Sequence, residues 1–213
     1  GQAHARTAAK LDLFQVAGIF DPSLERRAEA AKSGFQAHDR IEPLLDGCDA
    51  LIVASPTQFH HGLSLQALQA GKALLVEKPL AGTLQEGEEI LRAAAGKKVQ
   101  VGHIERFNPA VEFLVSHGTS PKFIQAERLT RGDGRALDVS VVHDLMIHDI
   151  DVVLSLVRTR VVSFQAIGLP VLSALDDLVH VRLTFEDGCL ANLSASRISL
   201  RPKREIRLFY PDR

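Results

Sequence analysis

Four short apolar segments alternate with helix-like segments over the first hundred residues, and this alternation constrains the fold more than any other feature. The apolar segments are residues 14–20, 50–54, 73–76 and 99–102. The helix-like segments are residues 2–11, 25–31, 58–70 and 83–96. Short, continuous apolar strands separated by helices are typical of a parallel sheet that helices cover on both faces. The sequence therefore predicts an α/β domain with a doubly wound parallel sheet of the Rossmann type.

The pattern changes after Gly102. Helices are predicted over residues 109–115 and 139–157, and strands over residues 123–130, 161–167, 178–185 and 189–198. Asp187-Gly188, between the last two strands, is a strong hairpin signal. Consecutive antiparallel strands indicate an α+β domain with an open, mostly antiparallel sheet and helices on one face. We therefore expect a dinucleotide-binding domain over residues 1–104 and a substrate-binding and oligomerisation domain over residues 105–213.

Composition and charge exclude several classes of function. The chain has 25 Lys and Arg residues against 26 Asp and Glu residues, and it lacks the basic face of a nucleic-acid-binding protein. Its apolar runs are too short to span a bilayer. Cys48 and Cys189 match no metal-binding or redox spacing, so we expect reduced thiols. These features predict a cytoplasmic protein that binds neither nucleic acid nor membrane.

Polar residues follow the predicted strands of the first domain, at the edge where doubly wound sheets bind ligands. Asp21 follows the first apolar segment, and an acidic residue at that place accepts hydrogen bonds from the hydroxyl groups of an adenosine ribose. An Asp before Pro22 is also typical of an ordinary turn. Gly1 at the place of the last glycine of a phosphate-binding turn favours the cofactor interpretation.

Three further residues suit proton transfer. Lys78 ends a predicted strand, and a lysine in a pocket can share a proton with a substrate hydroxyl, although an exposed loop lysine is commoner. Asp144 and His148 are four residues apart on a predicted helix, so both project from one face. With Asp151 they form an alternative set of three metal ligands, or simply a polar stripe at a domain interface. No second cluster of metal-binding residues accompanies them, so we expect no metal.

Three motifs together resemble the Gfo/Idh/MocA family of oxidoreductases, over nearly the whole chain. The motifs are Ser55-Pro56-Thr57-x-x-His60, Glu77-Lys78-Pro79-Leu80 and Asp144-x-x-x-His148. The resemblance implies that Lys78, Asp144 and His148 line the site where hydride leaves a sugar carbon. It also implies contacts to a nicotinamide cofactor at Gly1, Asp21, Ser55, Pro56, Thr57, His60, Glu77 and Lys78.

Two longer segments, residues 101–110 and 144–151, resemble the branch of this family that oxidises the 3-hydroxyl of UDP-N-acetylglucosamine to a ketone. By position, His103, Arg106 and Asn108 would face the nicotinamide or the sugar. The cofactor is expected to be NAD, with NADP left open, because Asp21 is negatively charged where a 2′-phosphate would bind. If Gly1 is the third glycine of the phosphate loop, the first strand and two glycines are absent, so we expect residues beyond both ends of this sequence.

The sequence thus predicts hydride transfer between a sugar hydroxyl carbon and nicotinamide. His148 would remove the hydroxyl proton, Lys78 would stabilise the alkoxide and Asp144 would orient the pair, and the roles of Lys78 and His148 can be exchanged. A dinucleotide-sensing regulatory protein and a metal-dependent hydrolase are the alternatives. We expect a sugar or nucleotide-sugar substrate, and a homodimer or homotetramer formed through a sheet face with small polar residues. These residues are Asn192, Ser194 and Ser196.

Overall fold

A computed structural model describes residues 1–116, 118–131 and 139–211 of the protein. The chain divides into two compact units, Gly1–Gly102 and His103–Arg213. Within the described ranges, no helix combines the length and the apolar character that are needed to cross a membrane.

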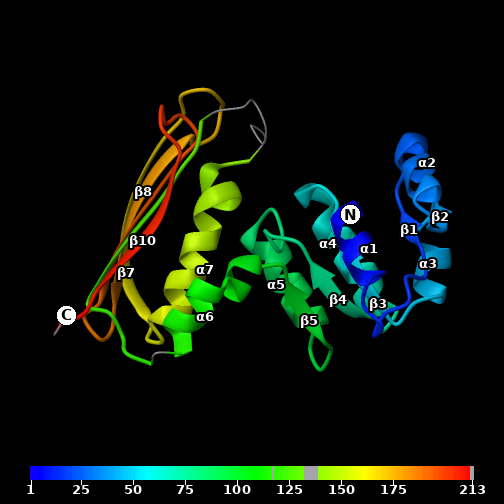
Figure 1. The fold of residues 1–213 in the computed structure, drawn as a ribbon, viewed down its shortest axis with the longest axis horizontal. Coiled ribbons are helices and arrows are strands. Elements are labelled where there is room, and N and C mark those ends of the chain that lie inside the picture. The colour runs from blue at the N-terminus through cyan, green and yellow to red at the C-terminus, as the bar shows by residue number, and fades with distance from the viewer. Residues whose placement is uncertain (117, 132–138, 212–213) are drawn as a thin grey trace. The chain divides into compact units, whose positions relative to one another are not determined.

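Unit 1 alternates helices and parallel strands (Figure 1). Its elements are α1 (Gln2–Ala8), β1 (Ile19–Phe20), α2 (Leu24–Lys32), β2 (Ala37–His38), α3 (Glu42–Asp46), β3 (Ala50–Val53), η1 (Thr57–Phe59), α4 (His60–Gln69), β4 (Ala73–Val76), α5 (Leu84–Ala93) and β5 (Val99–Val101). The strands form a three-stranded sheet in the order β3-β4-β5 and a separate pair, β1-β2. Every pairing is parallel, which confirms the predicted Rossmann-type α/β arrangement.

The first strand is shorter than the apolar pattern predicts. Residues 14–20 were expected to be one strand, but only Ile19 and Phe20 pair, with Ala37 and His38 of β2. A strand needs a hydrogen-bonded neighbour, and β2 offers only two residues. β2 and α3 were not predicted, because each is too short to produce a periodic pattern.

The core of unit 1 lies between the β3–β5 sheet and its helices. Val53, Val76, Leu68 and Ile90 are each at most 2% exposed and belong to one apolar cluster. Two helices begin at the residues that the sequence predicted as caps, Ser23 and Thr83. The Ser23 hydroxyl accepts the Arg26 N–H at the start of α2. At the start of α5, Thr83 and Glu86 form a reciprocal capping box.

Unit 2 is a five-stranded sheet with helices. Its elements are η2 (Ile104–Phe107), α6 (Pro109–Ser116), β6 (Phe123–Leu129), η3 (Val142–Met146), α7 (Ile147–Leu156), β7 (Val161–Leu169), β8 (Leu178–Phe185), β9 (Leu190–Ser196) and β10 (Lys203–Phe209). The strand order is β10-β6-β9-β8-β7, and only the β6–β9 pair is parallel. This confirms the predicted open, mostly antiparallel sheet. The β8–β9 hairpin turns at Gly188, whose φ of 82° favours glycine.

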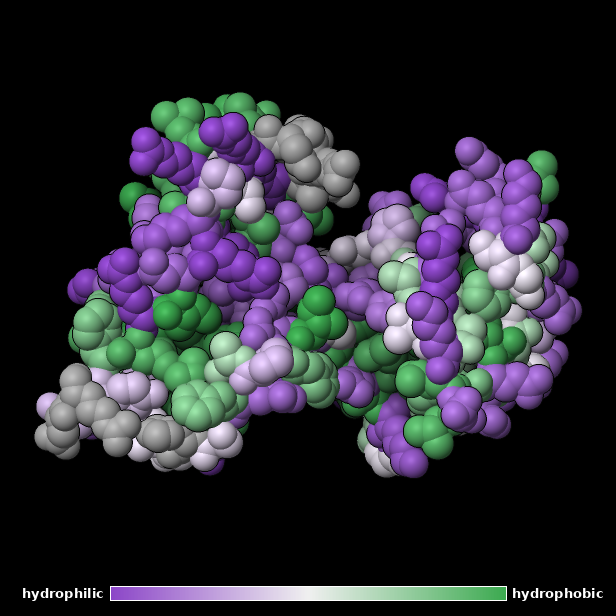
Figure 2. Space-filling model, viewed as in Figure 1, coloured by the Kyte–Doolittle hydropathy of each residue, from purple (hydrophilic) through white to green (hydrophobic). Residues whose placement is uncertain are grey.

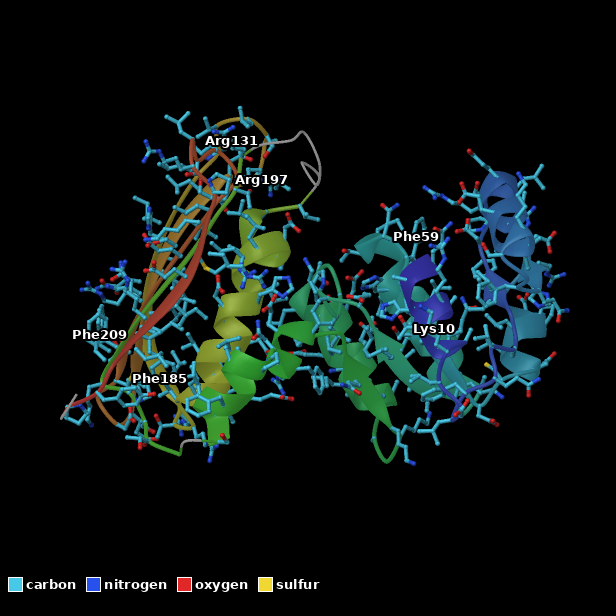
Figure 3. The ribbon with its side chains drawn as sticks, in the orientation of Figure 1. Lys10, Phe59, Arg131, Phe185, Arg197 and Phe209 are labelled. Atoms are coloured by element: carbon cyan, nitrogen blue, oxygen red, sulfur yellow. The ribbon has the colours of Figure 1, made fainter. Side chains whose placement is uncertain are left out.

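One face of this sheet packs against α7. Alternate residues of β8, Val179, Leu183 and Phe185, are buried with Val153 of α7 in one apolar cluster. Phe185 lies at the same end of the sheet as Phe209, while Arg131 and Arg197 lie at the other end (Figure 3). This packing fixes α7, the helix that carries His148, against the sheet.

The opposite face of the sheet is more polar. On it, the Arg182 Nε donates to the Asn192 Oδ1 at 2.9 Å, and the His180 ring lies 2.7 Å from the Ser194 hydroxyl. The prediction that Ser196 also belongs to an exposed face is wrong. Ser196 is buried, and its hydroxyl accepts the N–H of Ile198 in the segment that follows β9, so this side chain does not face solvent.

Strand β7 is one of the two edge strands of the sheet, and all nine of its residues are exposed. Its large apolar side chains include Val162, Phe164, Ile167 and Leu169. The loop after β7 adds exposed Val171 and Leu172, and green hydrophobic atoms are visible at that end of the unit in Figure 2. Unit 2 therefore presents an apolar edge beside a polar outer face.

Candidate active site

Two polar turns lie at one edge of the β3–β4–β5 sheet. The parallel strands β3 and β4 pair Val53 with Val76 at their carboxyl ends. Ser55-Pro56-Thr57 follows β3, and Glu77-Lys78-Pro79 follows β4. The Glu77 N–H donates to the Val53 carbonyl at 2.9 Å, so the two turns leave the sheet as neighbours. Unit 1 thus brings together both of these predicted site segments at the edge where parallel sheets bind ligands.

His60 contacts both of these turns. It is the first residue of α4 and is 1% exposed. Its Nε2 lies 2.9 Å from the Ser55 carbonyl oxygen, and its Nδ1 lies 2.8 Å from the Pro79 carbonyl oxygen. Both ring nitrogens are therefore occupied by backbone groups of unit 1. The adjacent His61 instead contacts the Glu89 carboxylate at 2.8 Å.

The Glu77 side chain is also engaged within unit 1. Its Oε1 lies 2.6 Å from the Nε2 of His4 in α1, and its Oε2 accepts the Lys78 N–H at 3.2 Å. A Cβ at Gly102 would lie 2.9 Å from the Glu77 Oε2, so a larger residue there would displace the Glu77 carboxylate. The contact with His4 was not predicted, because 73 residues separate the two partners. Lys78 itself is half-buried at the end of β4.

Asp21 follows β1, as predicted, in the other parallel pair of unit 1. Its Oδ1 accepts the Ser23 N–H at 2.8 Å, and Arg27 donates to the backbone carbonyl of Asp21 at 2.9 Å. The Asp21 Oδ2 has no hydrogen bond among the described residues, so it can accept from a ribose hydroxyl. Gly1 is the N-cap of α1, where a Cβ would meet no atom within 4 Å. The carboxylate of Asp21 and the hydroxyl groups of Ser55 and Thr57 are of the chemical types that bind ribose hydroxyls, and their contact with NAD stays a prediction.

Asp144 and His148 lie on a helix of unit 2 that changes type between them. Residues Val142–Met146 form a π-helical turn, and α7 continues from Ile147. The sequence predicted one uninterrupted α-helix over residues 139–157, because apolar periodicity does not distinguish one π-turn. Such turns are frequent at functional sites. Asp144 and His148 are both half-buried, and among the described residues no group of three His, Cys, Asp or Glu side chains is suited to a metal ion.

A buried ion pair holds α7 against the sheet. The Arg128 guanidinium of β6 binds both carboxylate oxygens of Asp149, at 3.0 and 2.7 Å. The two side chains are only 9% and 4% exposed. Glu105 of η2 lies 3.9 Å from the same guanidinium and also pairs with Arg204 of β10. The need for such a partner could have been read from the sequence. Arg128 is four residues after Ile124 in a strand, so both side chains lie on the same buried face, and a buried arginine needs a counter-charge.

The residues predicted to face the substrate have local contacts in unit 2. Arg106 donates to both oxygens of Asp151, at 2.8 and 2.6 Å, and this hydrogen bonding raises the pKa of Arg106. The His103 Nδ1 lies 3.9 Å from the same carboxylate. Asn108 accepts the Ala110 N–H at the start of α6. Asp151 therefore holds Arg106 and lies near His103, whereas Asn108 bonds to the start of α6, and the contact of all three residues with substrate stays a prediction.

Asp177 anchors the chain around the start of the η3–α7 helix. Its carboxylate accepts the N–H groups of Val171, Leu172 and Ser173, and Arg197 lies 3.5 Å away. Burial by itself would raise the pKa of Asp177, but these hydrogen bonds hold it well below its usual range. The adjacent Asp176 carbonyl accepts the Val141 N–H, which ties the first turn of the helical segment to this loop.

Comparisons with known proteins agree over both units. Residues 1–104 match the oxidoreductase family with an NAD-binding Rossmann fold, and residues 111–210 match the GFO/IDH/MocA C-terminal domain. These matches define an NAD-binding oxidoreductase of two-domain architecture. The chain belongs to the Gfo/Idh/MocA family, as its motifs predicted.

Several relatives are named dehydrogenases. The chain is 36% identical over 217 residues to UDP-N-acetylglucosamine 3-dehydrogenase of Acidithiobacillus ferrooxidans. This match covers 100% of this chain and 69% of that protein. A structure of that enzyme has a TM-score of 0.94 at 35% identity and covers 100% of this chain and 71% of that one. The chain is also 31% identical over 208 residues to scyllo-inositol 2-dehydrogenase (NAD(+)) of Bacillus subtilis, covering 85% of this chain and 59% of that protein.

These findings confirm the predicted class of enzyme and its cofactor. The protein is an oxidoreductase of a family whose amino-terminal domain binds NAD. The alternative of a non-enzymatic regulatory protein is not favoured, because the relatives are named for dehydrogenase activities.

Proposed function

We propose that the protein oxidises a hydroxyl carbon of a nucleotide sugar, and that the preferred substrate is a UDP-N-acetylhexosamine oxidised at its 3-hydroxyl. The observation that carries this proposal is the 36% identity to UDP-N-acetylglucosamine 3-dehydrogenase, which extends over the whole of this chain. The inositol dehydrogenase at 31% identity supports hydroxyl oxidation more generally, and it makes a cyclic polyol the second substrate class.

The proposed chemistry divides between the two units. Lys78 lies at the carboxyl end of β4 in unit 1, and Asp144 and His148 lie on the η3–α7 helix in unit 2. In this proposal His148 takes the hydroxyl proton, Lys78 stabilises the developing oxyanion and Asp144 orients the pair, or Lys78 and His148 exchange roles. NAD, when bound, accepts the hydride.

Residues of unit 1 would hold the cofactor. In this proposal the Asp21 carboxylate accepts hydrogen bonds from the adenosine ribose, and the Ser55–Thr57 turn after β3 adds further contacts to the cofactor. A negative carboxylate at that place repels a 2′-phosphate, so we propose a preference for NAD over NADP. In unit 2, His103, Arg106 and Asn108 would lie toward the sugar.

The experiment is a substrate screen of the protein with NAD. UDP-N-acetylglucosamine, UDP-N-acetylgalactosamine, UDP-glucose and scyllo-inositol are each supplied at equal concentration, and reduced nicotinamide is followed by absorbance. The proposal expects the highest kcat/KM with a UDP-N-acetylhexosamine and a 3-keto product by mass spectrometry. Faster turnover of scyllo-inositol than of the UDP sugars contradicts the proposal. So does a failure to reduce NAD with any of the four compounds.

We further propose a homodimer or homotetramer formed through the outer face of the unit 2 sheet. Its support is a polar surface of short side chains, including Asn192 and Ser194, that offers hydrogen bonds with little steric conflict. Sedimentation at micromolar concentration tests this, and Asn192→Arg should shift the protein toward monomer. A monomeric wild type contradicts the proposal.

A cytoplasmic location is proposed from two free thiols, Cys48 and Cys189, and cell fractionation tests it.

A further inference from the structure

Helix α7 holds two arginine side chains through buried aspartates, and the two arginines differ in their access to solvent. Asp149 binds Arg128 of β6, whose side chain is only 9% exposed. Asp151 binds Arg106 of η2, whose side chain is 56% exposed although Asp151 itself is 8% exposed. The first pair is enclosed, whereas the second combines a buried carboxylate with a guanidinium that a ligand can reach.

The Arg106 guanidinium has one edge fixed and the other edge open. Its Nε donates to the Asp151 Oδ2 at 2.8 Å and its Nη2 donates to the Oδ1 at 2.6 Å, so the carboxylate sets the plane of the group. A guanidinium has five N–H donors, and these bonds use two of them. Within the described part of the chain, Arg106 donates to no other acceptor. Its Nη1 end therefore offers donors in a fixed direction.

These donors lie near the residue to which the proposed function assigns proton transfer. Asp151 follows His148 by three residues on α7, so the two side chains share one face of the helix, about one turn apart. Arg106 is bonded directly to Asp151. A substrate group that binds Arg106 therefore belongs to the part of the sugar next to the hydroxyl that His148 would deprotonate.

The charge of the Arg106–Asp151 pair favours a neutral acceptor. The carboxylate compensates the guanidinium, and its hydrogen bonds raise the pKa of Arg106, so the group stays a donor without presenting an uncompensated charge. In a UDP-N-acetylhexosamine, the carbon next to C3 carries an acetamido group, and its carbonyl oxygen is such an acceptor. UDP-glucose carries a hydroxyl at that carbon, which does not extend as far from the ring.

We propose that Arg106 is a specificity residue that donates from its Nη1 end to the acetamido carbonyl of the sugar, and that Asp151 is the positioning residue that aims it. The inference rests on the proposed function, because it names the group by which the preferred substrate differs from UDP-glucose. Asp151 does not touch the sugar in this arrangement. Its contribution is to hold the guanidinium plane while the sugar binds.

The test measures sugar binding without turnover. The protein is saturated with NADH, which cannot accept a hydride, and is titrated in a calorimeter with UDP-N-acetylglucosamine or UDP-glucose. A hydrogen bond from a charged donor contributes about ten- to a hundredfold, so the wild type should prefer the acetamido sugar by that factor. Arg106→Lys keeps the positive charge but loses the planar fork, so the preference should fall to about threefold or less.

Two further variants separate aiming from folding. Asp151→Asn leaves Arg106 in place but removes the carboxylate that orients it, and it should also lose most of the preference. Arg158→Lys is the matched control, because Arg158 is exposed and donates only to the Val115 carbonyl, at 3.0 Å, among the described residues. A merely structural defect weakens the binding of both sugars alike, so the ratio of the two dissociation constants isolates the contact. If Asp151→Asn does not fold, Arg106→Lys decides, since that side chain is exposed.

The outcomes distinguish this inference from the proposed function. Equal binding of the two sugars by the wild type, or an unchanged preference in Arg106→Lys, overturns the inference even if the protein oxidises UDP-N-acetylglucosamine. A wild type that prefers the acetamido sugar through Arg106, but transfers no hydride in the substrate screen, supports the inference and refutes the proposed function. Binding of neither sugar overturns both.

Discussion

Removing one partner of the buried Arg128–Asp149 pair should destabilise unit 2 strongly. The pair has two hydrogen bonds, at 3.0 and 2.7 Å, and side chains that are 9% and 4% exposed. Asp149→Asn keeps the shape of the side chain but leaves a guanidinium charge in a buried place. Such a loss typically costs about 3–5 kcal/mol. Glu105, at 3.9 Å from Arg128, remains as a partial counter-charge, so we expect about 3 kcal/mol.

The assay must suit a chain without tryptophan. The sequence has no Trp and one Tyr, so far-UV circular dichroism in urea is the appropriate probe. Two compact units can unfold in separate transitions, and the loss should then appear in the transition of unit 2. The matched control is Arg26→Met, which breaks an exposed pair with Glu29 and should change stability by less than about 1 kcal/mol.

A double variant tests the reasoning behind this magnitude. Arg128→Met combined with Asp149→Leu removes both charges and fills the space with apolar atoms, so it should cost less than Asp149→Asn alone. If Asp149→Asn costs no more than the exposed control, the pair is solvated and does not hold α7 against the sheet.

Three further results are expected. Lys78→Ala and His148→Ala should each lower kcat by roughly two to four orders of magnitude while NAD still binds by calorimetry, and near-normal turnover in either would remove that residue from the chemistry. Asp21→Ser should raise kcat/KM for NADP relative to NAD, and an unchanged ratio would contradict the ribose assignment. The lowered pKa of Asp177 stabilises the fold above about pH 4 and loses that effect as pH falls further, so the stability difference between wild type and Asp177→Asn should shrink in acid. A stability difference between wild type and Asp177→Asn that grows in acid would contradict the lowered pKa of Asp177.

Local signals in the sequence were sufficient for most elements of the fold. Strand β4 has the predicted bounds, 73–76, because four consecutive apolar residues lie between a glycine-containing turn and a charged segment. The capping residues Ser23 and Thr83 begin α2 and α5 as predicted, since their hydroxyl groups accept the N–H groups left open at helix starts. The sequence pattern also placed Ser55 and Glu77 just after β3 and β4, whereas the roles of the motif residues came from the family resemblance and stay predictions.

Features that depend on distant partners were not predictable. The π-helical turn at Val142–Met146 leaves no periodic trace, and its position depends on packing against the sheet. The parallel pairing of β6 with β9 joins residues that are 67 positions apart, so no local hairpin signal in the sequence could have predicted it. The contact between His4 and Glu77 and the two carbonyls at His60 need the folded sheet to bring the partners together.

The most direct test of the central claim follows the hydride itself. UDP-N-acetylglucosamine carrying deuterium at C3 is incubated with the protein and NAD, and the reduced nicotinamide is analysed by mass spectrometry. Our account predicts one deuterium in each reduced nicotinamide and a 3-keto sugar that has lost it. Unlabelled reduced nicotinamide with deuterium retained at C3 would contradict the account, because the hydride would then come from another carbon.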